Sequence, residues 1–589
     1  MSLLQRHRCV ICLPVFAVIF ITLAVSSYVR ESATWDEPQH LVAGYSALRL
    51  HDYRTDPEHP PFIRMWAALP LLTMDGIKVD LPPGIDSLAP AAWVMGGQFF
   101  FCHDTLYVAN DADRLLYAAR FMIVLLGVLL GVLLFCWALE LFGFWPAVVV
   151  LGLYTIEPNI LAHTRLVTTD FGVTCFVFAT VYFLWRTTRR LSTGNLCGLA
   201  CFFALAQISK FSAVLLGPAV LALLAVRACQ RSPWPVNIGR QTQLTGRLRR
   251  VAAALAIFAV LVVAAWGAIW AAYDFRYLPS DVSGWRMEFY KDPGALERTP
   301  TLTKAVAWVD ANRLLPNAYS QGFLLGQVKA QKRIGFLAGS YRTDGWWWFF
   351  PFAFLIKTPI SMLLLFVTGA VLSAVRWRRF LDDAVYAMWP LAAFLGAAMT
   401  AKLNIGERHI LPIHPFVLLL AGYAVAELCA ERRRSFRVLL GALGLFALLE
   451  FTQVCPHYLA FFNQFTGGPR NGHKYLIDSS LDWGQDLKGM KWWMDEHDVQ
   501  HINLSYFGTA DPAYYHINCT HLPGAPLFDT QLTTGPRLPG FVAVSVTNLR
   551  GVYFGEEARG FYKPLLDMKP AAVIGYSIYV YWVERPWWQ

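Results

Sequence analysis

The sequence predicts an all-α polytopic membrane protein that carries a small α/β domain at its C-terminal end. Hydrophobic residues make up 56% of the 589 residues, charged residues make up only 15%, and the mean hydropathy is +0.41. Soluble domains usually carry about 25% charged residues. The composition therefore excludes an ordinary soluble protein, and it excludes intrinsic disorder for most of the chain.

The predicted membrane spans are apolar runs of about 20 residues, the length at which a helix crosses the hydrocarbon core of a bilayer. The boundary within residues 196–229 is the weakest, because Lys210 lies there and leaves open a re-entrant pair or one long broken helix. We expect about eleven spans, at residues 9–29, 119–141, 144–162, 168–187, 196–212, 213–229, 251–273, 349–375, 384–402, 410–430 and 436–455.

The orientation follows from the arginine-rich segments. The basic segment Met1–Arg8 precedes the first run, which at about 20 residues is longer than the hydrophobic core of a signal peptide, so we expect an uncleaved first span. Further arginine clusters follow spans four, six, eight and ten. With eleven spans all of them lie on one side, which the positive-inside rule identifies as the cytoplasm. The net charge of +10 thus reflects topology, and a nucleic-acid partner is not expected.

Two regions result from this topology. Residues 1–455 form the predicted transmembrane domain, with large outward loops at 30–118 and 274–348, and residues 456–589 form a soluble outward-facing domain. We expect a plasma (inner) membrane protein with a cytoplasmic N-terminus. About 130 residues suffice for a small α/β domain. Its predicted elements are a helix at Leu487–His497 and strands at Ile502–Phe507, Phe541–Val546 and Ala572–Val583.

Charged residues gather at the outward ends of the predicted spans. Such carboxylates can act as a general base, bind a divalent cation or remain solvated loop charges. Asp170 would also suit the N-terminus of its helix. The carboxylates are Asp36 and Glu37 after span one, Glu58 in the same loop and Asp170 at the start of span four. The cations at the same level are Arg165, Lys357, Lys402, Arg408 and His409, and His59 follows Glu58 in the loop.

Lys357 is the most specific of these signals, because it lies inside the apolar run 349–375. In a continuous helix it would lie about 12 Å from the outer end. An unpaired lysine within the membrane costs about 2.5–3.5 kcal/mol. Phosphate binding, snorkelling to the surface or a structural ion pair would each offset that cost.

A set of motifs, in order along the chain, resembles a known family. Trp35-Asp36-Glu37 follows the first span, and Glu58-His59-Pro60-Pro61-Phe62 comes about twenty residues later. The later motifs are Ile156–His163 leading into Arg165–Asp170, Gly339–Trp346 leading into Lys357-Thr358-Pro359, Gly406–Pro412, Phe461–Gln464, and Leu481–Asp486. Together they resemble the lipid-carrier-dependent glycosyltransferases of the GT-C membrane fold, which include protein O-mannosyltransferases and the aminoarabinose transferases of lipid A (glycosyltransferase family 39-like).

The resemblance implies transfer of a sugar from a polyprenyl-phosphate carrier to a protein, lipid or glycan acceptor on the extracytoplasmic face, with inversion. It implies that Asp36 is the acceptor base, with Glu58 and Asp170 as further catalytic residues. Glu37, His59, Arg165, Lys357, Arg408 and His409 would bind substrate or phosphate. Relatives often carry lysine where His59 stands, which leaves phosphate binding at this position in doubt, because histidine is mostly neutral at pH 7.

A divalent metal and an acidic helix face are two further expectations. Mg²⁺ or Mn²⁺ would use Asp36 and Glu58 together with substrate phosphate, although a phosphate with nearby arginine or lysine needs no metal. The carboxylate- and histidine-rich loop matches no zinc spacing. Asp478, Asp482 and Asp486 recur every four residues and would form one acidic face on a helix.

The main alternative is a membrane transporter or lipid flippase. Transporters place their buried charges near the midplane of the bilayer and often consist of paired repeats. This sequence shows no internal repeat and places its polar residues at one face. The sequence therefore favours an enzyme over a transporter.

Overall fold

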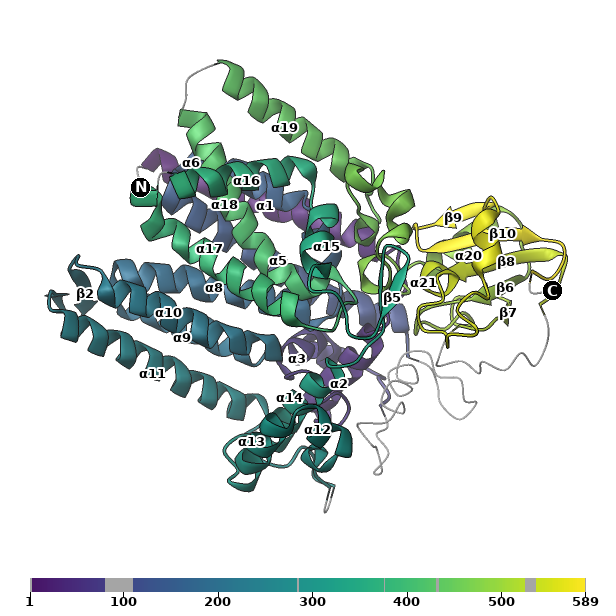
Figure 1. The fold of residues 1–589 in the computed structure, drawn as a ribbon, viewed down its shortest axis with the longest axis horizontal. Helices are drawn as coiled ribbons and strands as arrows, with labels where there is room; N and C mark the ends of the chain where they lie inside the picture. The colour runs from purple at the N-terminus through teal and green to yellow at the C-terminus, as the bar shows by residue number, and fades with distance from the viewer. Residues whose placement is uncertain are drawn as a thin grey trace.

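The computed structural model describes residues 3–79, 110–282, 285–375, 377–430, 434–524 and 536–587. A large body of helices makes up most of the molecule, and a small sheet lies at one side of it (Figure 1). Every apolar run predicted from the sequence falls on a helix or on a pair of consecutive helices.

Seven helices of the described chain are long and apolar enough to cross a membrane. Some of these include a 3-10 turn that continues into an α-helix. They are α1 (Leu3–Tyr28), α5 (Ala112–Phe142), α8 (Thr169–Arg189), η2 with α10 (Phe211–Leu215 and Leu216–Cys229), α11 (Arg247–Ala272), η4 with α18 (Glu407–Ile413 and His414–Ala430), and α19 (Arg434–Thr452).

Two further helix pairs pass the same test but are sharply bent. The α6–α7 pair (Phe144–Thr155 and Pro158–Thr164) bends by 61°, and the α15–α16 pair (Phe349–Lys357 and Ile360–Val375) bends by 117°. The described residues thus give seven spans, or nine with the pairs, and the expected eleven are not confirmed. The two remaining runs fall on the shorter α9 (Thr193–Gln207) and on α17 (Trp377–Thr400). The run at 349–375 is a bent helix pair and not one continuous helix.

The break between α15 and α16 has a local cause. Pro359 has no backbone N–H, and it disfavours helical backbone in the residue before it. The groups freed at the break find partners elsewhere. The amide of Asn463 donates to the carbonyls of Leu355 (2.7 Å) and Thr358 (2.8 Å), and Glu450 accepts from the backbone N–H of Ile360 at 2.8 Å. The break is therefore a specific feature of the fold, because side chains bind the free backbone groups of both helix ends.

Burial differs greatly between the helices. Nearly every side chain of α8 is buried, and α8 packs against α5, α9 and η4. By contrast, α1 and α19 expose apolar side chains, among them Val10, Ile11, Val438 and Leu445. Exposed apolar faces of this kind are suited to contact lipid. Helix α8 is thus the centre of the bundle, and α1 and α19 lie at its edge.

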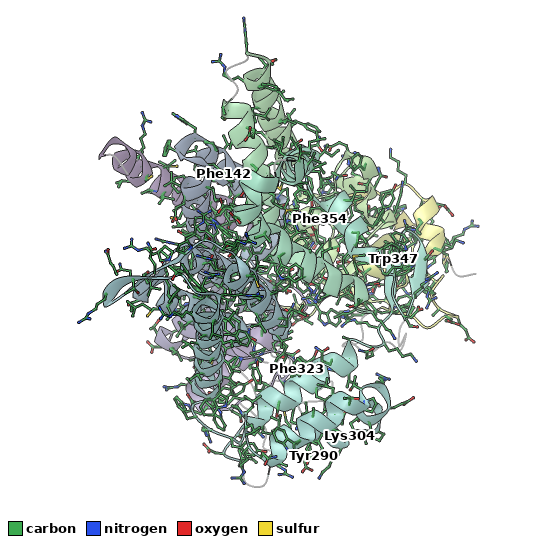
Figure 2. All side chains as sticks on the ribbon, turned by 60° about the vertical axis from the view of Figure 1, so that its left-hand side comes forward. Phe142, Tyr290, Lys304, Phe323, Trp347 and Phe354 are labelled. Atoms are coloured by element: carbon green, nitrogen blue, oxygen red, sulfur yellow. The ribbon has the colours of Figure 1, made fainter. Side chains whose placement is uncertain are left out.

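Short helices cover one end of the bundle. The loop after α1 forms α2 (Glu37–Leu50), α3 (Phe62–Ala68) and η1 (Leu69–Thr73). A separate helical lobe carries the labelled Tyr290, Lys304 and Phe323 (Figure 2). This lobe consists of η3 (Phe289–Lys291), α12 (Pro293–Arg298), α13 (Pro300–Ala311) and α14 (Asn317–Lys329), and the hairpin β4–β5 (Gly335–Leu337 and Ser340–Arg342) follows it.

The last part of the chain contains a five-stranded mixed sheet of order β7-β6-β8-β10-β9. Strand β6 is parallel to β7 and β8, whereas β10 is antiparallel to β8 and β9. The bounds are β6 Ile502–Ser505, β7 Cys519–His521, β8 Gly540–Ser545, β9 Ala572–Ile574 and β10 Ile578–Val583, with helices α20 Leu487–Glu496 and α21 Val546–Leu549. The remaining 3-10 turns are η5 Tyr458–Ala460, η6 Gln464–Thr466, η7 Pro469–Lys474, η8 Asp478–Ser480 and η9 Lys563–Asp567.

A second small sheet lies at the other end of the bundle. Its order is β1-β2-β3, with β1 (Leu191–Ser192) directly after α8 and the hairpin β2–β3 (Trp234–Ile238 and Arg240–Leu244) before α11. The hairpin turns at Gly239, whose φ of 70° suits a residue without a Cβ.

The contact between α2 and α3 depends on Gly44. A Cβ on Gly44 would overlap the carbonyl oxygen of Arg64, which is backbone and cannot rotate away. Overpacking of this kind costs about 1–3 kcal/mol. We expect Gly44→Ala to lower the unfolding temperature in detergent. Gly152→Ala is the matched control, because its Cβ would meet nothing within 4 Å, and equal stability of the two variants would contradict this packing.

Candidate active site

One cavity of about 430 Å³ lies where the loop after α1 meets the bundle and the C-terminal part of the chain. Five of the residues predicted from the sequence line it: Asp36, Glu58, His59, Arg408 and His409. Its other lining residues are Trp35, Gln39, His40, Asp56, Arg333, Leu403, Ile405, Asp478, Trp483, Phe507 and Tyr553. The cavity thus brings together residues from opposite ends of the sequence.

Asp36 forms an ion pair with Arg408 in this cavity. Asp36 occupies the N-cap position of α2, yet its side chain makes no capping hydrogen bond. Instead, Nη1 of Arg408 donates to its Oδ2 at 2.6 Å. The guanidinium also lies 4.2 Å from the ring centre of Trp483, a cation–π contact. Asp36 is therefore held toward the cavity and is not used as a helix cap.

Asp170 lies behind Arg408 in the first turn of α8. It is buried and forms an ion pair with Lys210, and its second oxygen lies 3.7 Å from Nη1 of Arg408. Arg408 therefore lies between two carboxylates, Asp36 and Asp170. This arrangement holds the arginine in place and connects α8 to the cavity wall.

Glu58 and His59 approach the cavity from the loop before α3. Glu58 is partly exposed and pairs with Lys329 at the end of α14. Burial lowers the pKa of His59 to about 3, so this histidine is neutral at physiological pH. His40 and Arg64 each lie 2.8 Å from the buried carboxylate of Asp56, which fixes the same loop.

His409 lines the cavity next to Arg408. Its ring packs edge-on against Phe350, and its Nε2 is buried without a hydrogen-bond partner in the described part of the chain. A buried polar atom without a partner is uncommon in a native structure. His409 is thus a residue with spare hydrogen-bonding capacity in the cavity wall.

Glu37, in contrast, does not line the cavity. Both of its oxygens accept from Arg120, from Nε at 2.8 Å and from Nη2 at 2.6 Å, and both side chains are fully buried. Glu37 also accepts from the backbone N–H groups of Thr34 and Val167. The hydrogen bonds of the Glu37 carboxylate therefore hold Arg120 and the backbone in place.

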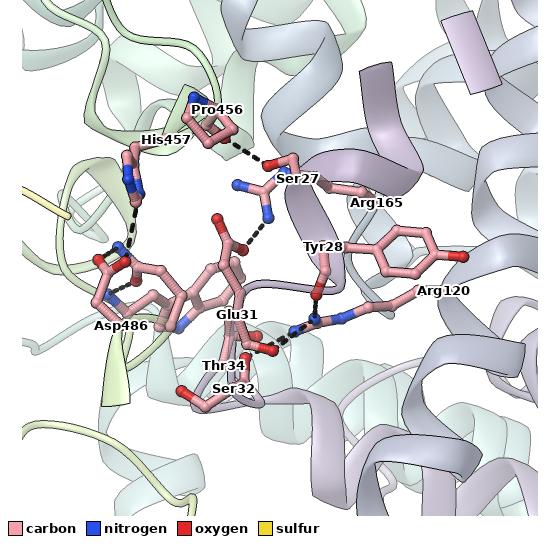
Figure 3. Close-up of polar contacts among 12 residues, drawn as sticks. Ser27, Tyr28, Glu31, Ser32, Thr34, Arg120, Arg165, Pro456, His457 and Asp486 are labelled. Carbon is pink, nitrogen blue, oxygen red and sulfur yellow. Dashed lines mark hydrogen bonds and ion pairs between the residues drawn. The ribbon is translucent and has the colours of Figure 1, made fainter. Parts of the chain in front are cut away.

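Arg165 is also packed away from the cavity lining. It forms a buried ion pair with Glu31, and its guanidinium lies 5.9 Å from the ring centre of Tyr458. Figure 3 shows this pair beside the contacts of Arg120 with the chain after α1. His457 and Asp486 from the C-terminal part of the chain lie in the same polar cluster.

Lys357 lies at the break between α15 and α16 and not in the middle of a helix. Its Nζ donates to the carbonyls of Leu459 (2.8 Å) and Ser480 (2.7 Å) and lies 4.6 Å from the ring centre of Phe462. Lys357 thus ties the broken helix to two loops of the C-terminal part of the chain. It is buried and does not line the cavity.

The three aspartates that recur every four residues do not form an acidic helix face. Asp478 lies in the short turn η8, with a positive φ of 55°, and accepts from Tyr553 in the cavity. Asp482 accepts from the backbone N–H of Thr547 at 2.9 Å, and Asp486 accepts from the hydroxyl of Ser577 at 2.7 Å. The chain turns between them because Leu481 and Gly484 leave helical backbone, so each carboxylate meets a different segment.

Three cavity residues, Phe507, Tyr553 and Arg333, carried no functional signal in the sequence. Phe507 stacks on Trp35 at 4.8 Å between ring centres, and Tyr553 stacks on Phe507 at 5.5 Å. Arg333 lies over the Tyr553 ring, and its Nη2 is 3.5 Å from the Tyr553 hydroxyl. The contacts of Phe507 with Trp35 and of Arg333 with Tyr553 join segments more than two hundred residues apart, so neither motif nor periodicity could have identified them.

A metal site is not visible in the side-chain geometry. The part of the chain that the structure describes holds no group of three or more histidine, cysteine, aspartate or glutamate side chains placed to bind a metal ion. Asp36 is paired with Arg408 and Glu58 with Lys329. Both carboxylates expected to bind a metal are thus engaged by basic side chains in this structure, and a divalent metal at Asp36 and Glu58 stays a prediction.

Residues 112–270 match the sequence model of the family described as dolichyl-phosphate-mannose-protein mannosyltransferase. The resemblance to lipid-carrier-dependent glycosyltransferases is confirmed for this stretch. It runs from α5 nearly to the end of α11 and includes Asp170 and Arg165 but not Asp36 or Arg408. A comparison with curated protein sequences finds no match.

Several solved structures share similarity with the chain at low identity. The oligosaccharyltransferase of Archaeoglobus fulgidus, tethered to an acceptor peptide, is 12% identical with a TM-score of 0.45 over 78% of this chain, which spans only 56% of that protein. Its apo form is 13% identical with a TM-score of 0.47, over 95% and 72% of the two chains. ArnT from Cupriavidus metallidurans, bound to undecaprenyl phosphate, is 12% identical with a TM-score of 0.30, over 96% and 97%.

The contacts of Lys357 predict a structural role that can be separated from phosphate binding. Lys357→Met keeps the apolar stem but leaves the carbonyls of Leu459 and Ser480 without their donor, at about 1–3 kcal/mol for each buried group. We expect a lower unfolding temperature in detergent without any ligand. If Lys357 held phosphate instead, the variant would keep the wild-type unfolding temperature and show a raised KM for the donor.

The burial of Asp482 predicts a pH-dependent stability. Burial, with a contribution from Asp486, raises the pKa of the Asp482 carboxyl to about 8. The folded protein therefore keeps a proton that the unfolded chain releases above about pH 4. Stability should fall as the pH rises from about 4 to about 8, because the folded state binds more protons in that window. Asp482→Asn should flatten this part of the unfolding-temperature profile, and an unchanged slope would contradict the assignment.

Proposed function

We propose that the protein is an integral membrane glycosyltransferase that moves a sugar from a polyprenyl-phosphate carrier to an acceptor on the extracytoplasmic face. The single observation that carries the proposal is the pairing of Asp36 with Arg408 in a cavity that also has aromatic walls. A carboxylate, nearby cations and stacking surfaces are what sugar transfer from a phosphate requires. The mannosyltransferase match of residues 112–270 supports the same class.

In the proposed reaction, a hydroxyl of the acceptor donates a hydrogen bond to the carboxylate of Asp36. Its oxygen attacks the anomeric carbon of the sugar while the bond from that carbon to the phosphate oxygen breaks. The phosphate leaves with the electron pair, and the proton of the acceptor passes to Asp36. A single displacement of this kind inverts the configuration of the sugar. Asp170 acts through Arg408 and holds it next to Asp36.

Positive charge for the departing phosphate would come from arginines of the cavity. Arg408 is already shared between Asp36 and Asp170. Arg333 lines the same cavity and has no carboxylate within ion-pair distance in the described chain, so its guanidinium keeps donors for a phosphate. Arg165 and Lys357, predicted for this role from the sequence, have buried structural partners, and we assign the phosphate to Arg408 and Arg333 instead.

The C-terminal part of the chain would form the acceptor side of the site. Phe507 and Tyr553 come from this part of the chain, and they continue the aromatic stack that begins at Trp35, next to Asp36. Glu58 and His59 line the same cavity. An acceptor hydroxyl, whether on protein, lipid or glycan, would reach Asp36 through this cavity. We further propose a plasma-membrane protein with a cytoplasmic N-terminus, which puts this cavity outside the cytoplasm.

Release of polyprenyl phosphate tests the proposal. Purified protein in nanodiscs is given a panel of polyprenyl-phosphate sugars with cell-envelope extract as acceptor, and free polyprenyl phosphate is measured by mass spectrometry. We expect Asp36→Asn to lower turnover by about 10²–10⁴-fold, the usual contribution of general-base catalysis. Asp75→Asn, an exposed aspartate of the same loop, is the control and should keep wild-type turnover.

Two outcomes would contradict the proposal. Wild-type turnover by Asp36→Asn would remove Asp36 from the chemistry. Uptake of labelled donor into sealed vesicles without any released polyprenyl phosphate would favour the transporter alternative.

A further inference from the structure

A second cavity, of about 410 Å³, lies at the opposite end of α8 from Asp170. The 21 residues of α8 span about 30 Å, the thickness of the hydrocarbon core, so the two cavities lie on opposite sides of a membrane. Arg186, Arg189 and Arg190 line the second cavity, together with Trp185 and the carboxylates Glu140 and Asp383.

The carboxylates in this cavity do not occupy all the hydrogen-bond donors of its arginines. Arg189 pairs with Asp383, but Arg186 is 3.7 Å from Glu140, too far for a hydrogen bond. Arg190 has no carboxylate within ion-pair distance in the described part of the chain. Three guanidinium groups therefore face two carboxylates, and two of the three have donors to spare.

Neutral donors provide some of the hydrogen bonds that the two carboxylates of this cavity accept. The hydroxyl of Tyr182 donates to Glu140 at 2.6 Å, and Nε1 of Trp185 donates to Asp383 at 2.8 Å. Each carboxylate thus has a hydrogen bond that does not come from an arginine. The spare guanidinium donors remain available for an anion from outside the protein, and arginine binds phosphate through such paired donors.

The place of the cavity identifies the kind of anion. The lining comes from the ends of α5 and α8, the start of α9 and from α17, and Leu141 and Trp185 supply apolar surface. Tryptophan at the end of a membrane-spanning helix typically lies at the level of lipid head groups. Basic pockets between membrane helices are sites for anionic lipid head groups. A ligand with a phosphate group and acyl chains would satisfy the arginines and keep its tails in the bilayer.

We propose that this cavity binds the head group of an anionic phospholipid. Arg186 and Arg190 hold its phosphate, and the bound lipid joins the ends of α5, α8 and α17. This site does not depend on the proposed transferase activity, because it lies at the other end of α8. The lipid binds the folded protein and therefore raises its unfolding temperature.

The experiment compares wild type, Arg190→Gln, the double variant Arg186→Gln/Arg190→Gln, and Arg247→Gln. Arg247 begins α11 with an exposed side chain outside the cavity and is the matched control. Each protein is placed in nanodiscs of phosphatidylcholine with or without phosphatidylglycerol. Native mass spectrometry measures retained phosphatidylglycerol, and the unfolding temperature is measured in parallel. Arg190→Gln removes no ion pair, so it keeps the test valid if the double variant folds poorly.

We expect phosphatidylglycerol to be retained by wild type and Arg247→Gln and to raise their unfolding temperatures. The affinity should fall about tenfold in Arg190→Gln, which corresponds to about 1.4 kcal/mol, and further in the double variant. Equal retention by all four proteins would overturn the proposal. An equal stabilisation of lipid-free wild type by inorganic phosphate, which Arg190→Gln abolishes, would show a site for a soluble anion and would also overturn it.

Discussion

The buried ion pair between Glu37 and Arg120 is the interaction on which the geometry of the cavity depends. Arg120 also donates to the carbonyls of Tyr28 and Ser32, so it fixes the chain where α1 ends. Glu37 accepts from the N–H of Val167, which lies just before α8. A buried pair of this kind is not evidence of stability, because desolvation offsets much of its attraction. The pair instead fixes the positions of the residues next to it. It holds Asp36 and the segment leading to Asp170 on either side of Arg408.

A second constraint comes from breaks in the membrane helices. Each break frees backbone groups that water cannot reach, and the chain must supply partners for them. At the α15–α16 break these partners are Asn463 and Glu450, and Lys357 at the same break donates to carbonyls of the C-terminal part of the chain. Two of the contacts involve the C-terminal part of the chain, which therefore completes the bundle. This dependence explains how Asp478 and Trp483 come to line a cavity that begins at Asp36.

The sequence predicted the parts of this arrangement that depend on local patterns. Apolar runs located the helices, and the Trp-Asp-Glu motif located Asp36 at the cavity. The sequence could not predict the ion-pair partners. Glu37 and Asp36 are neighbours with the same type of side chain, yet they pair with Arg120 and Arg408, which are far away in the chain. Lys357 was identified as unusual from its apolar surroundings, but its partners are backbone carbonyls, which carry no residue-specific signal. Phe507 and Tyr553 reach the cavity only through the C-terminal fold.

The two ends of α8 differ in the charge that the helix itself favours. Asp170 lies in the first turn, and Arg186 and Arg189 lie in the last, which is the arrangement that the helix dipole stabilises at both ends. At the cavity near Asp170 the dipole thus contributes to holding the carboxylate that faces Arg408. At the other end the dipole opposes a phosphate, so any anion that binds there must be held by the arginine side chains. The spare donors of Arg186 and Arg190 are therefore the deciding feature of the second cavity, and the helix end alone would not attract an anion.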